Sequence, residues 1–347
     1  MTPAPVVSVV MAAYNGARLI EETLSSLSRQ TMGAWEAIVV DDCSTDDTRA
    51  VVAGWHDPRV RLVALPRNGG PVRARNQALT HARGRYIAAL DQDDLCHPDR
   101  FARQVAFLDA APEVALLGTA TQVLSETGLT RARHTQVTTP ALVGWQLRFS
   151  NPLVWSSVMV RGEVARALDP FTRPDMLYAE DFDLYHRVAQ HGAVARIDEP
   201  LVTYRSHADG CSQRYEDVML ASAERVLSGA LHETFGGMAT DAARLFVRHL
   251  MHGAPVPDGA TLGRLAALLD HARLRYLATT RADATDRRLI ARETRRVWAN
   301  VLRAGLRHAT IGLRDAIAAG PVASVARVDR LAWSRMIGQV RPWLAAG

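Results

Sequence analysis

The sequence predicts an α/β protein with a mostly parallel central sheet, followed by an α-helical region. Two observations support this fold class. In the first half of the chain, short β-branched runs alternate with segments of helical periodicity, which is the pattern of βαβ units. After about residue 213 the apolar residues follow helical spacing almost throughout. We therefore expect one domain over residues 1–212 and a helical C-terminal region over residues 213–347.

The first ninety residues are expected to hold four strands and three helices. Residues 6–12 form a β-branched run between Pro5 and the turn at Asn15-Gly16, so they predict a buried strand. A helix from Thr48 is expected to be capped by Ser44 or Thr45. The other strands are expected at 37–40, 60–65 and 86–90, and the helices at 16–30, 48–55 and 72–82.

The rest of the chain gives a weaker strand pattern and then a strong helical one. Short strands are expected at 114–119, 154–160, 194–197 and 202–204. Helices are expected at 182–190, 218–231, 262–277 and 289–306. The stretch from His271 onward is rich in arginine, which fits either an anionic surface or a solvated helical bundle.

Composition excludes several classes of protein. With 347 residues, 48% hydrophobic and 22% charged, the chain is globular rather than disordered. Its three cysteines form no CxxC pair, which argues against a disulfide framework or a structural zinc site. All 41 basic residues are arginine, so mechanisms that need a lysine are excluded. With no targeting segment and no run long enough to span a membrane, a cytoplasmic location is expected.

Acidic residues follow two of the expected strands. The run Asp91-Gln92-Asp93-Asp94 comes directly after the strand at 86–90, and its carboxylates suit a hard divalent cation. The pair Asp41-Asp42 ends the strand at 37–40, where a carboxylate could accept hydrogen bonds from a base or ribose. A solvated acidic turn would also explain the run at 91–94, and a helix cap would explain Ser44 to Asp47, but a cap explains Asp41 and Asp42 less readily.

Three further features carry possible chemistry. The turn at Asn68-Gly69-Gly70 leads into a helix in which Arg75 could reach a diphosphate. Glu180-Asp181 opens a helix, and an acid near a cleft can act as a general base, although acids also simply favour a helix N-terminus. His207 is, taken alone, more often a structural hydrogen-bonding residue than a ligand.

Taken in order, these motifs resemble family 2 glycosyltransferases of the GT-A fold, including those of bacterial surface-polysaccharide assembly. The resemblance covers residues 5–212 and leaves the last 135 or so residues outside it. The motifs that carry it are 8–16, 26–31, 39–46, 68–70 with Arg75-Asn76, 91–94 with Pro98, 180–184 and 204–207.

The resemblance implies roles for individual residues. Ala12 and Tyr14 would line the nucleobase pocket, and Asp42 would bond the base. Arg75 would lie near the base or diphosphate, and Asp91 near the ribose or sugar. The remaining nucleotide-sugar contacts are expected from Ala13, Asn15, Asp41, Gly70, Gln92 and Glu180.

The same resemblance implies the chemistry. Asp181 would be the general base, and Asp93 would hold Mg²⁺ or Mn²⁺, with His207 at a second metal or diphosphate contact. The reaction would be an inverting transfer of a sugar from a UDP, dTDP or GDP sugar to an acceptor hydroxyl on a glycan or a lipid-linked molecule. Outside the resemblance, the arginine-rich helical region is expected to contact acceptor, a second copy of the chain, or an anionic membrane as a peripheral protein, and no nucleic-acid partner is expected.

Two other functions remain open from the sequence. A nucleotidyltransferase also uses a nucleotide-binding fold with an acidic metal site, but it usually carries a basic glycine-rich loop after the first strand. Here that position is Ala13-Tyr14-Asn15-Gly16. A non-catalytic nucleotide-sugar-binding protein is the other alternative, and the presence of Asp91, Asp93 and Asp181 argues against it.

Overall fold

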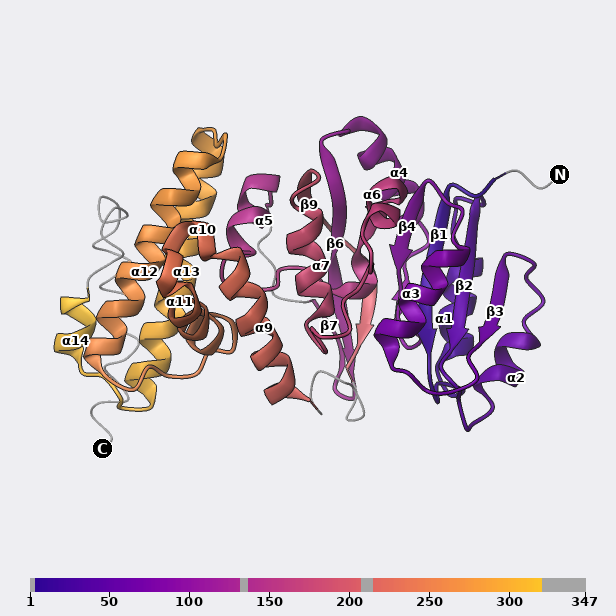
Figure 1. The fold of residues 1–347 in the computed structure, drawn as a ribbon, viewed down its shortest axis with the longest axis horizontal. Coiled ribbons are helices and arrows are strands. Elements are labelled where there is room, and N and C mark those ends of the chain that lie inside the picture. The colour runs from indigo at the N-terminus through magenta and orange to yellow at the C-terminus, as the bar shows by residue number, and fades with distance from the viewer. Residues whose placement is uncertain (1–3, 132–136, 207–214, 320–347) are drawn as a thin grey trace. The chain divides into compact units, whose positions relative to one another are not determined.

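The computed structural model describes residues 4–131, 137–206 and 215–319. The chain divides into two compact units, Met1–Val247 and Arg248–Gly347. The all-helical pattern was expected from about residue 213, and a helix does start at Glu216. The boundary between the two compact units lies later, after Val247. Figure 1 labels the elements of both units.

Four parallel strands form one half of the sheet in the first unit. They are β1 (Val7–Ala13), β2 (Trp35–Asp41), β3 (Val60–Ala64) and β4 (Tyr86–Ala89), in the spatial order β3-β2-β1-β4. Each lies within two residues of its predicted bounds. Because this order reverses direction at β1, loops at the carboxyl ends of β1 and β4 flank a switch point, where ligands bind in such sheets.

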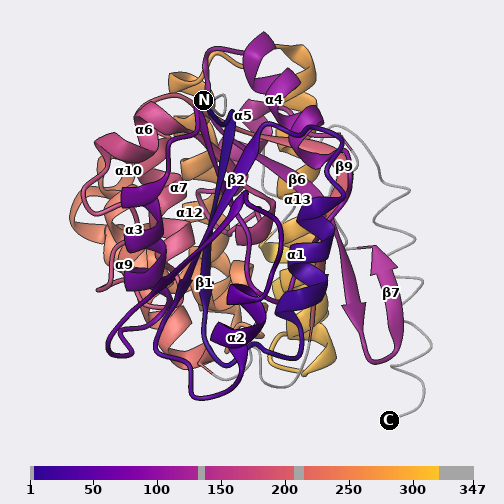
Figure 2. The same ribbon diagram turned by 90° about the vertical axis from the view of Figure 1, so that its right-hand side faces the viewer.

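Helices cover both faces of these strands, as Figure 2 shows with α1 on one side and α3 on the other. The helix α1 spans Ile20–Ser28, α2 spans Thr48–Ala53 and α3 spans Pro71–His81. The strand order explains the arrangement, because right-handed crossovers toward β3 and back to β4 place their helices on opposite faces.

The sheet continues as a mixed one beyond β4. In the described part of the chain it has nine strands, ordered β3-β2-β1-β4-β8-β6-β9-β5, with β7 paired to β6. Strands β4 and β8 are antiparallel, as are β8 and β6, whereas β6 and β9 are parallel. The added strands are β5 (Leu95–Cys96), β6 (Val114–Ser125), β7 (Gly128–Arg131), β8 (Met159–Arg161) and β9 (Ala193–Arg205).

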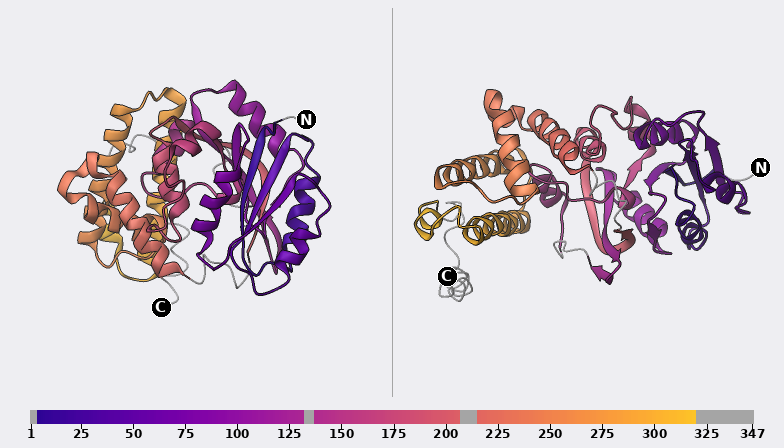
Figure 3. Two further views of the ribbon diagram at one scale, coloured as in Figure 1. Left: turned by 45° about the vertical axis from the view of Figure 1, so that its right-hand side comes forward. Right: turned by 90° about the horizontal axis from the view of Figure 1, so that it is seen from below.

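Figure 3 shows the ribbon in two further views. The remaining helices of the first unit are α4 (Arg100–Ala110), α5 (Pro140–Gln146), η1 (Trp155–Ser157), α6 (Gly162–Ala167), α7 (Glu180–Val188), α9 (Glu216–Ala230), α10 (His232–Phe235), η2 (Gly236–Met238) and α11 (Ala239–Phe246). Of these, those up to α7 contact the sheet, whereas α9 contacts α7 and the later ones contact α9 or one another.

The second unit is helical throughout its described residues. After the π-helical turn η3 (Val247–Met251) it consists of α12 (Gly259–Thr279), α13 (Ala284–Arg307) and α14 (Leu313–Ala318). One face of α13 is buried through residues such as Val297, Trp298 and Val301. None of the described helices is long and apolar enough to span a membrane.

The core of the first unit explains why the strands read as continuous apolar runs. Val9, Met11 and Val39 are fully buried between the two helical layers, as are Leu24 and Leu27 of α1. A side chain of this size contributes about 1.5–3 kcal/mol when it is removed from water. Burial on both faces disfavours polar residues in the middle of β2 and β4, and Asp41 and Asp91 stand at or just after the ends of these strands.

Three local predictions were wrong. Residues 154–160 form the 3₁₀ turn η1 and the short strand β8 rather than one strand. The strands expected at 194–197 and 202–204 are a single strand, β9, whose register shifts between Ile197 and Val202 accommodate Pro200 in a bulge. The N-cap residue of α2 is Asp47 rather than Ser44 or Thr45, and it makes no side-chain capping bond. Asp46 Oδ1 instead accepts a hydrogen bond from the Thr48 N–H at 3.0 Å.

Candidate functional site

The loops after β1, β2 and β4 bring most of the predicted site residues to one edge of the sheet. Ala12 and Ala13 end β1, and Tyr14 and Asn15 begin the next loop. Asp41 ends β2 beside Ala13, with which it is paired in register. Asp91 follows β4 after one buried leucine. Carboxyl ends of parallel strands meet at one edge, so sequence positions 12–15, 41–42 and 91–94 become neighbours.

Gln92 ties the first of these loops to the last. Its Oε1 accepts a hydrogen bond from the Tyr14 N–H at 3.0 Å, and its Nε2 donates to the Tyr14 carbonyl at 3.0 Å. The Gln92 side-chain amide therefore satisfies both backbone hydrogen-bonding groups of Tyr14, as a residue of a neighbouring strand would. The phenol ring of Tyr14 is 45% exposed and is free to meet a ligand face.

Asn15 ties the first loop to the second. Its backbone φ is +48°, a conformation that asparagine adopts more readily than most residues. Its N–H donates to Ser44 Oγ at 3.1 Å, and its Oδ1 accepts from the Thr45 N–H at 2.9 Å. Ser44 and Thr45, expected to cap α2, thus hold the loop that follows β1 instead.

The two predicted base-binding carboxylates have extensive internal contacts. Asp41 is fully buried, pairs with Arg49 Nε at 2.5 Å and accepts from the Ser44 N–H. Asp42 accepts from the Gly69 N–H at 2.8 Å and from the Gly70 N–H at 2.7 Å. Gly70 has φ +84°, and its missing side chain permits this turn. Asp42 therefore fixes the turn before α3, and a bond from it to a nucleobase stays a prediction.

Arg75 lies at the centre of an ion-pair cluster. Its Nη1 donates to Glu180 Oε1 at 2.6 Å, and its Nη2 donates to Asp91 Oδ1 at 2.9 Å. Its guanidinium carbon lies 4.5 Å from the centre of the Trp155 ring. The buried arginine thus joins α3, the loop after β4 and the start of α7, and its place near a base or diphosphate stays a prediction.

Asp181 stands in the first turn of α7 beside this cluster. Its Oδ2 accepts from Asn151 Nδ2 at 2.8 Å, and its Oδ1 accepts from the Phe182 N–H at 2.7 Å. Burial and the neighbouring Glu180 carboxylate raise the pKa of Asp181 to about 6, against the opposing effects of Asn151 and Arg75. A carboxylate with such a pKa is ionised at neutral pH and still basic enough to accept a proton.

Several buried polar atoms around Arg75 and Asp181 lack a hydrogen-bond partner among the described residues. They are Glu180 Oε2, Trp155 Nε1 and the Tyr185 hydroxyl. Tyr185 lies one helical turn after Asp181 on α7, so the two side chains share a face of that helix. Unsatisfied polar groups are rare inside proteins and, when clustered, point to a functional site.

The acidic run after β4 is anchored to β9. Asp94 Oδ1 accepts from the Arg205 N–H at 2.8 Å, and Arg205 Nε donates to the Asp93 carbonyl at 2.9 Å. Burial, with Asp91 and Asp93 nearby, raises the pKa of Asp94 well above its usual range. His207 lies outside the described residues. Across the part of the chain that is described, no group of three or more histidines, cysteines or acids is placed to hold a metal ion.

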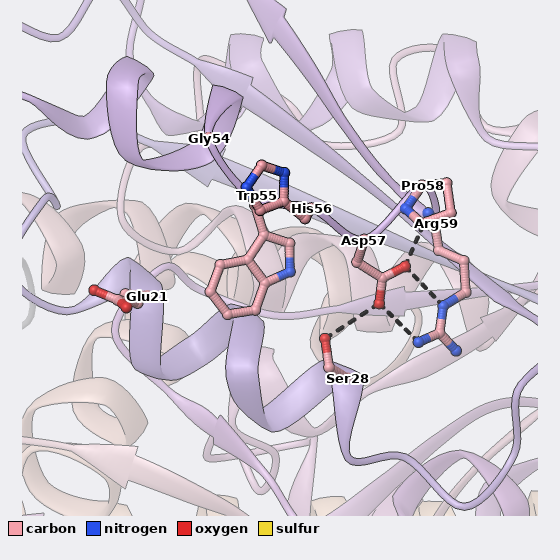
Figure 4. Close-up of a pocket in the computed structure, with 8 residues that line it drawn as sticks. All are labelled: Glu21, Ser28, Gly54, Trp55, His56, Asp57, Pro58 and Arg59. Atoms are coloured by element: carbon pink, nitrogen blue, oxygen red, sulfur yellow. Dashed lines mark hydrogen bonds and ion pairs between the residues drawn. The ribbon is translucent and has the colours of Figure 1, made fainter.

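A separate pocket lies on the α1–α2 side of the sheet and contains none of the predicted site residues. Figure 4 shows Asp57 hydrogen-bonded to Ser28 and paired with Arg59 within it. The pocket is lined by Glu21, Ser28, Gly54, Trp55, His56, Asp57, Pro58 and Arg59. The bonds drawn there connect α1 to the loop before β3, which is a structural role.

Sequence reasoning missed Asn151, Trp155 and Tyr185. Asn151 and Trp155 lie outside every motif of the resemblance, in the segment between α5 and β8, and nothing local marks them as site residues. Tyr185 could have been found, because it follows Asp181 by four residues on an expected helix.

Comparisons with known proteins match this architecture. The model of the family described as glycosyl transferase family 2 matches residues 8–158. The succinoglycan biosynthesis protein ExoO of Rhizobium meliloti is 45% identical over 148 residues, which are 40% of this chain and 42% of that protein. The putative glycosyltransferase EpsE of Bacillus subtilis is 31% identical over 220 residues, which are 62% of this chain and 78% of EpsE.

The solved structures agree at the level of the fold. A mannosyltransferase, PcManGT, from Pyrobaculum calidifontis, in complex with GDP-Man and Mn²⁺, superposes with a TM-score of 0.54 at 21% identity. The superposition covers 89% of this chain and 88% of that one. The fold is therefore of the GT-A class, as the sequence predicted.

The relatives place the chain within that class. It belongs to glycosyl transferase family 2. The region that matches the family model ends at residue 158 and therefore does not include Asp181. The match to ExoO spans less than half of that protein. Asp181 and the helices after α7 lie outside the region that the family model matches.

Proposed function

We propose that this chain is a metal-dependent, inverting glycosyltransferase that moves a sugar from a nucleotide-diphosphate sugar to an acceptor hydroxyl, in polysaccharide or glycoconjugate assembly. The main support for the proposal is the environment of Asp181. Asp181 is a carboxylate with a raised pKa, held by two hydrogen bonds at the switch-point edge of a GT-A sheet. Family membership and the names of ExoO and EpsE support the class of reaction.

The contacts of Asp181 suit a general base. Each of its oxygens accepts one hydrogen bond from the protein, and a carboxylate oxygen has two lone pairs. One lone pair on each oxygen thus stays available for the proton of an acceptor hydroxyl. Removing that proton as the oxygen attacks the anomeric carbon makes a poor nucleophile a competent one, typically for a gain of about 10²–10⁴ in rate.

The loops after β1, β2 and β4 form the proposed donor site. Tyr14 offers an exposed ring to a nucleobase, and the N-terminus of α3, after the turn at Gly69-Gly70, would lie near the ligand. The donor is proposed to be a UDP, dTDP or GDP sugar. The named complex of PcManGT with GDP-Man supports this class of donor.

A divalent cation fits the chemistry of the acidic run. Asp93 supplies a hard carboxylate of the type that Mg²⁺ and Mn²⁺ prefer, next to Asp94, whose Oδ2 is buried without a partner among the described residues. We propose that Asp93 holds the metal, with His207 as a further contact. When bound, the cation would neutralise charge that develops on the departing diphosphate. The Mn²⁺ in the PcManGT complex supports the use of a divalent cation.

The helical region is proposed to contact the acceptor, a second copy of the chain, or an anionic membrane at which the protein would be peripheral. On α13 the exposed arginines Arg288, Arg292 and Arg295 recur at helical spacing, opposite its buried face. Sedimentation with anionic vesicles tests the membrane contact. A loss of pelleting when these three arginines become glutamine would support it, and pelleting equal to that on neutral vesicles would exclude it.

Binding and turnover together test the function. Calorimetric titration with UDP, GDP and dTDP, each with and without Mn²⁺, should show metal-dependent binding of one nucleotide. Asp181→Asn should bind that nucleotide normally and lose about 10²–10⁴ in turnover of the corresponding sugar donor. Asp109→Asn, which alters a half-exposed carboxylate paired with Arg85, is the control. Unchanged turnover in Asp181→Asn would exclude the general base, and nucleotide binding without any turnover would favour a sensor.

A further inference from the structure

We propose that Asn151 is a positioning residue that fixes the orientation of the Asp181 carboxylate toward the acceptor hydroxyl. The inference rests on the proposed function and adds a residue that no motif of the family resemblance contains. Asn151 is followed by the 3₁₀ turn η1 and precedes Asp181 by 30 residues. Asn151 therefore contacts the Asp181 carboxylate from a segment other than α7, the helix on which Asp181 lies.

The direction of the Asn151 amide is set by a second contact. Its Oδ1 accepts a hydrogen bond from the Leu153 N–H at 3.3 Å, while its Nδ2 donates to Asp181 Oδ2 at 2.8 Å. Rotating the amide by half a turn would place Oδ1 against a carboxylate oxygen and Nδ2 against an N–H group, and both contacts would then be repulsive. The donor therefore always faces Asp181.

Two donors from separate elements define the plane of the carboxylate. The Phe182 N–H holds Oδ1 at 2.7 Å from within α7, and Asn151 holds Oδ2 from the loop. With the helix contact alone, the carboxylate could rotate about its terminal torsion, which is soft in aspartate. Proton transfer needs the acceptor oxygen within hydrogen-bond reach and correctly aimed, so the loop contact matters for rate.

The charged surroundings give Asn151 an electrostatic role as well. The titratable and charged groups around Asp181 are Glu180 and Tyr185 on α7, Arg75 on α3, and Asp91 after β4. Arg75 is shared between Glu180 and Asp91, so its charge is largely engaged. The Asn151 hydrogen bond lowers the pKa of Asp181, in opposition to burial and to Glu180.

Asn151→Ala and Asn151→Asp test the proposal in the full-length protein with the donor and metal identified by titration. Either change removes the donor, and the aspartate keeps the shape while adding a like charge. We expect kcat at pH 7 to fall about 10- to 100-fold, the size of a lost hydrogen bond to a charged group. The acidic limb of the kcat profile should move to higher pH, further for Asn151→Asp, with nucleotide affinity unchanged.

A merely structural role would lower the amount of folded protein without moving the acidic limb. Gln190→Ala, an exposed change just after α7, is the matched control and should leave the profile in place. If either variant folds and shows a wild-type acidic limb, the proposal is overturned. If Asp181→Asn itself retains turnover, the proposed function fails first, and the two failures are thus distinguishable.

Discussion

The guanidinium of Arg75 and the carboxylate of Glu180, 105 residues apart in the sequence, form a buried ion pair with Nη1 and Oε1 2.6 Å apart. Asp91 shares the same arginine at 2.9 Å, and the Trp155 ring lies beneath it. The pair joins α3 to α7 across the candidate site. Because both carboxylates pair with Arg75, its loss would leave Glu180 and Asp91 without their cation.

Replacing this arginine should destabilise the protein strongly. Arg75→Gln leaves Glu180 without its buried partner, and we expect the free energy of unfolding to fall by about 3–5 kcal/mol. Arg244→Gln, which breaks an exposed pair with Asp241 on α11, is the control and should cost no more than about 0.5 kcal/mol. Urea unfolding of both variants measures the difference. Equal midpoints would mean that the cluster does not stabilise the fold.

The pH dependence of the rate should follow Asp181. Burial and Glu180 raise its pKa to about 6, and a general base works only when deprotonated. We therefore expect kcat to fall to about half its maximum as the pH is lowered to about 6, and to be flat only from about pH 7 to pH 8. A profile measured with saturating donor and acceptor tests this. A rate that stays constant down to pH 4.5 would contradict it.

The same raised pKa predicts that Asp181→Asn gains stability relative to wild type as the pH rises. In the unfolded chain an aspartate ionises at its ordinary value, so the folded state binds more protons between that value and about 6, and stability falls as the pH rises through this range. Asp181→Asn would direct its NH₂ group at one of the two donors that hold the carboxylate, and this cost is the same at every pH. Relative to wild type, the variant should therefore gain roughly 1–3 kcal/mol of unfolding free energy between pH 4.5 and pH 7.5. Urea titrations at both pH values measure this change. A difference between variant and wild type that is the same at pH 4.5 and 7.5 would argue against a raised pKa of Asp181.

Asp42 should be required for the turn before α3. Its two oxygens accept from the Gly69 and Gly70 N–H groups, and an asparagine would direct an NH₂ group at one of these donors. We expect Asp42→Asn to lower the free energy of unfolding by about 1–3 kcal/mol. The exposed neighbour Asp47, changed to asparagine, should alter it by less than about 0.5 kcal/mol. Equal losses in the two variants would show that the turn contact is not needed.

Two buried tyrosines give a paired test of the unsatisfied hydroxyl. The Tyr185 hydroxyl has no partner among the described residues, whereas the Tyr86 hydroxyl donates to Asp109 Oδ1 at 2.6 Å. Tyr185→Phe should leave the free energy of unfolding unchanged or raise it by up to about 1 kcal/mol, and Tyr86→Phe should lower it by about 0.5–1.5 kcal/mol. Thermal or urea unfolding measures both. A large loss in Tyr185→Phe would reveal a bond that the hydroxyl makes in solution.

Local pattern predicted the early strands and the acids that follow them. The strands β1 to β4 lie within two residues of their predicted bounds, because β-branched apolar runs buried on both faces are a strong signal. Strand β9 was predicted as two separate strands, because a bulge at Pro200 interrupts its run of apolar residues. The cap of α2 was misassigned because several capping residues stand in a row, and loop contacts decide which of them is used.

The sequence by itself determined the order of the first four strands and three helices and where carboxylates would stand at the strand ends. Both follow from periodicity along the chain and from the rule that parallel strands end at one edge. The tertiary structure alone decided which side chains meet: Arg75 with Glu180 and Asp91, and Asn151 with Asp181. These contacts depend on strand order and on the entry angle of α7, and no local pattern encodes either of them.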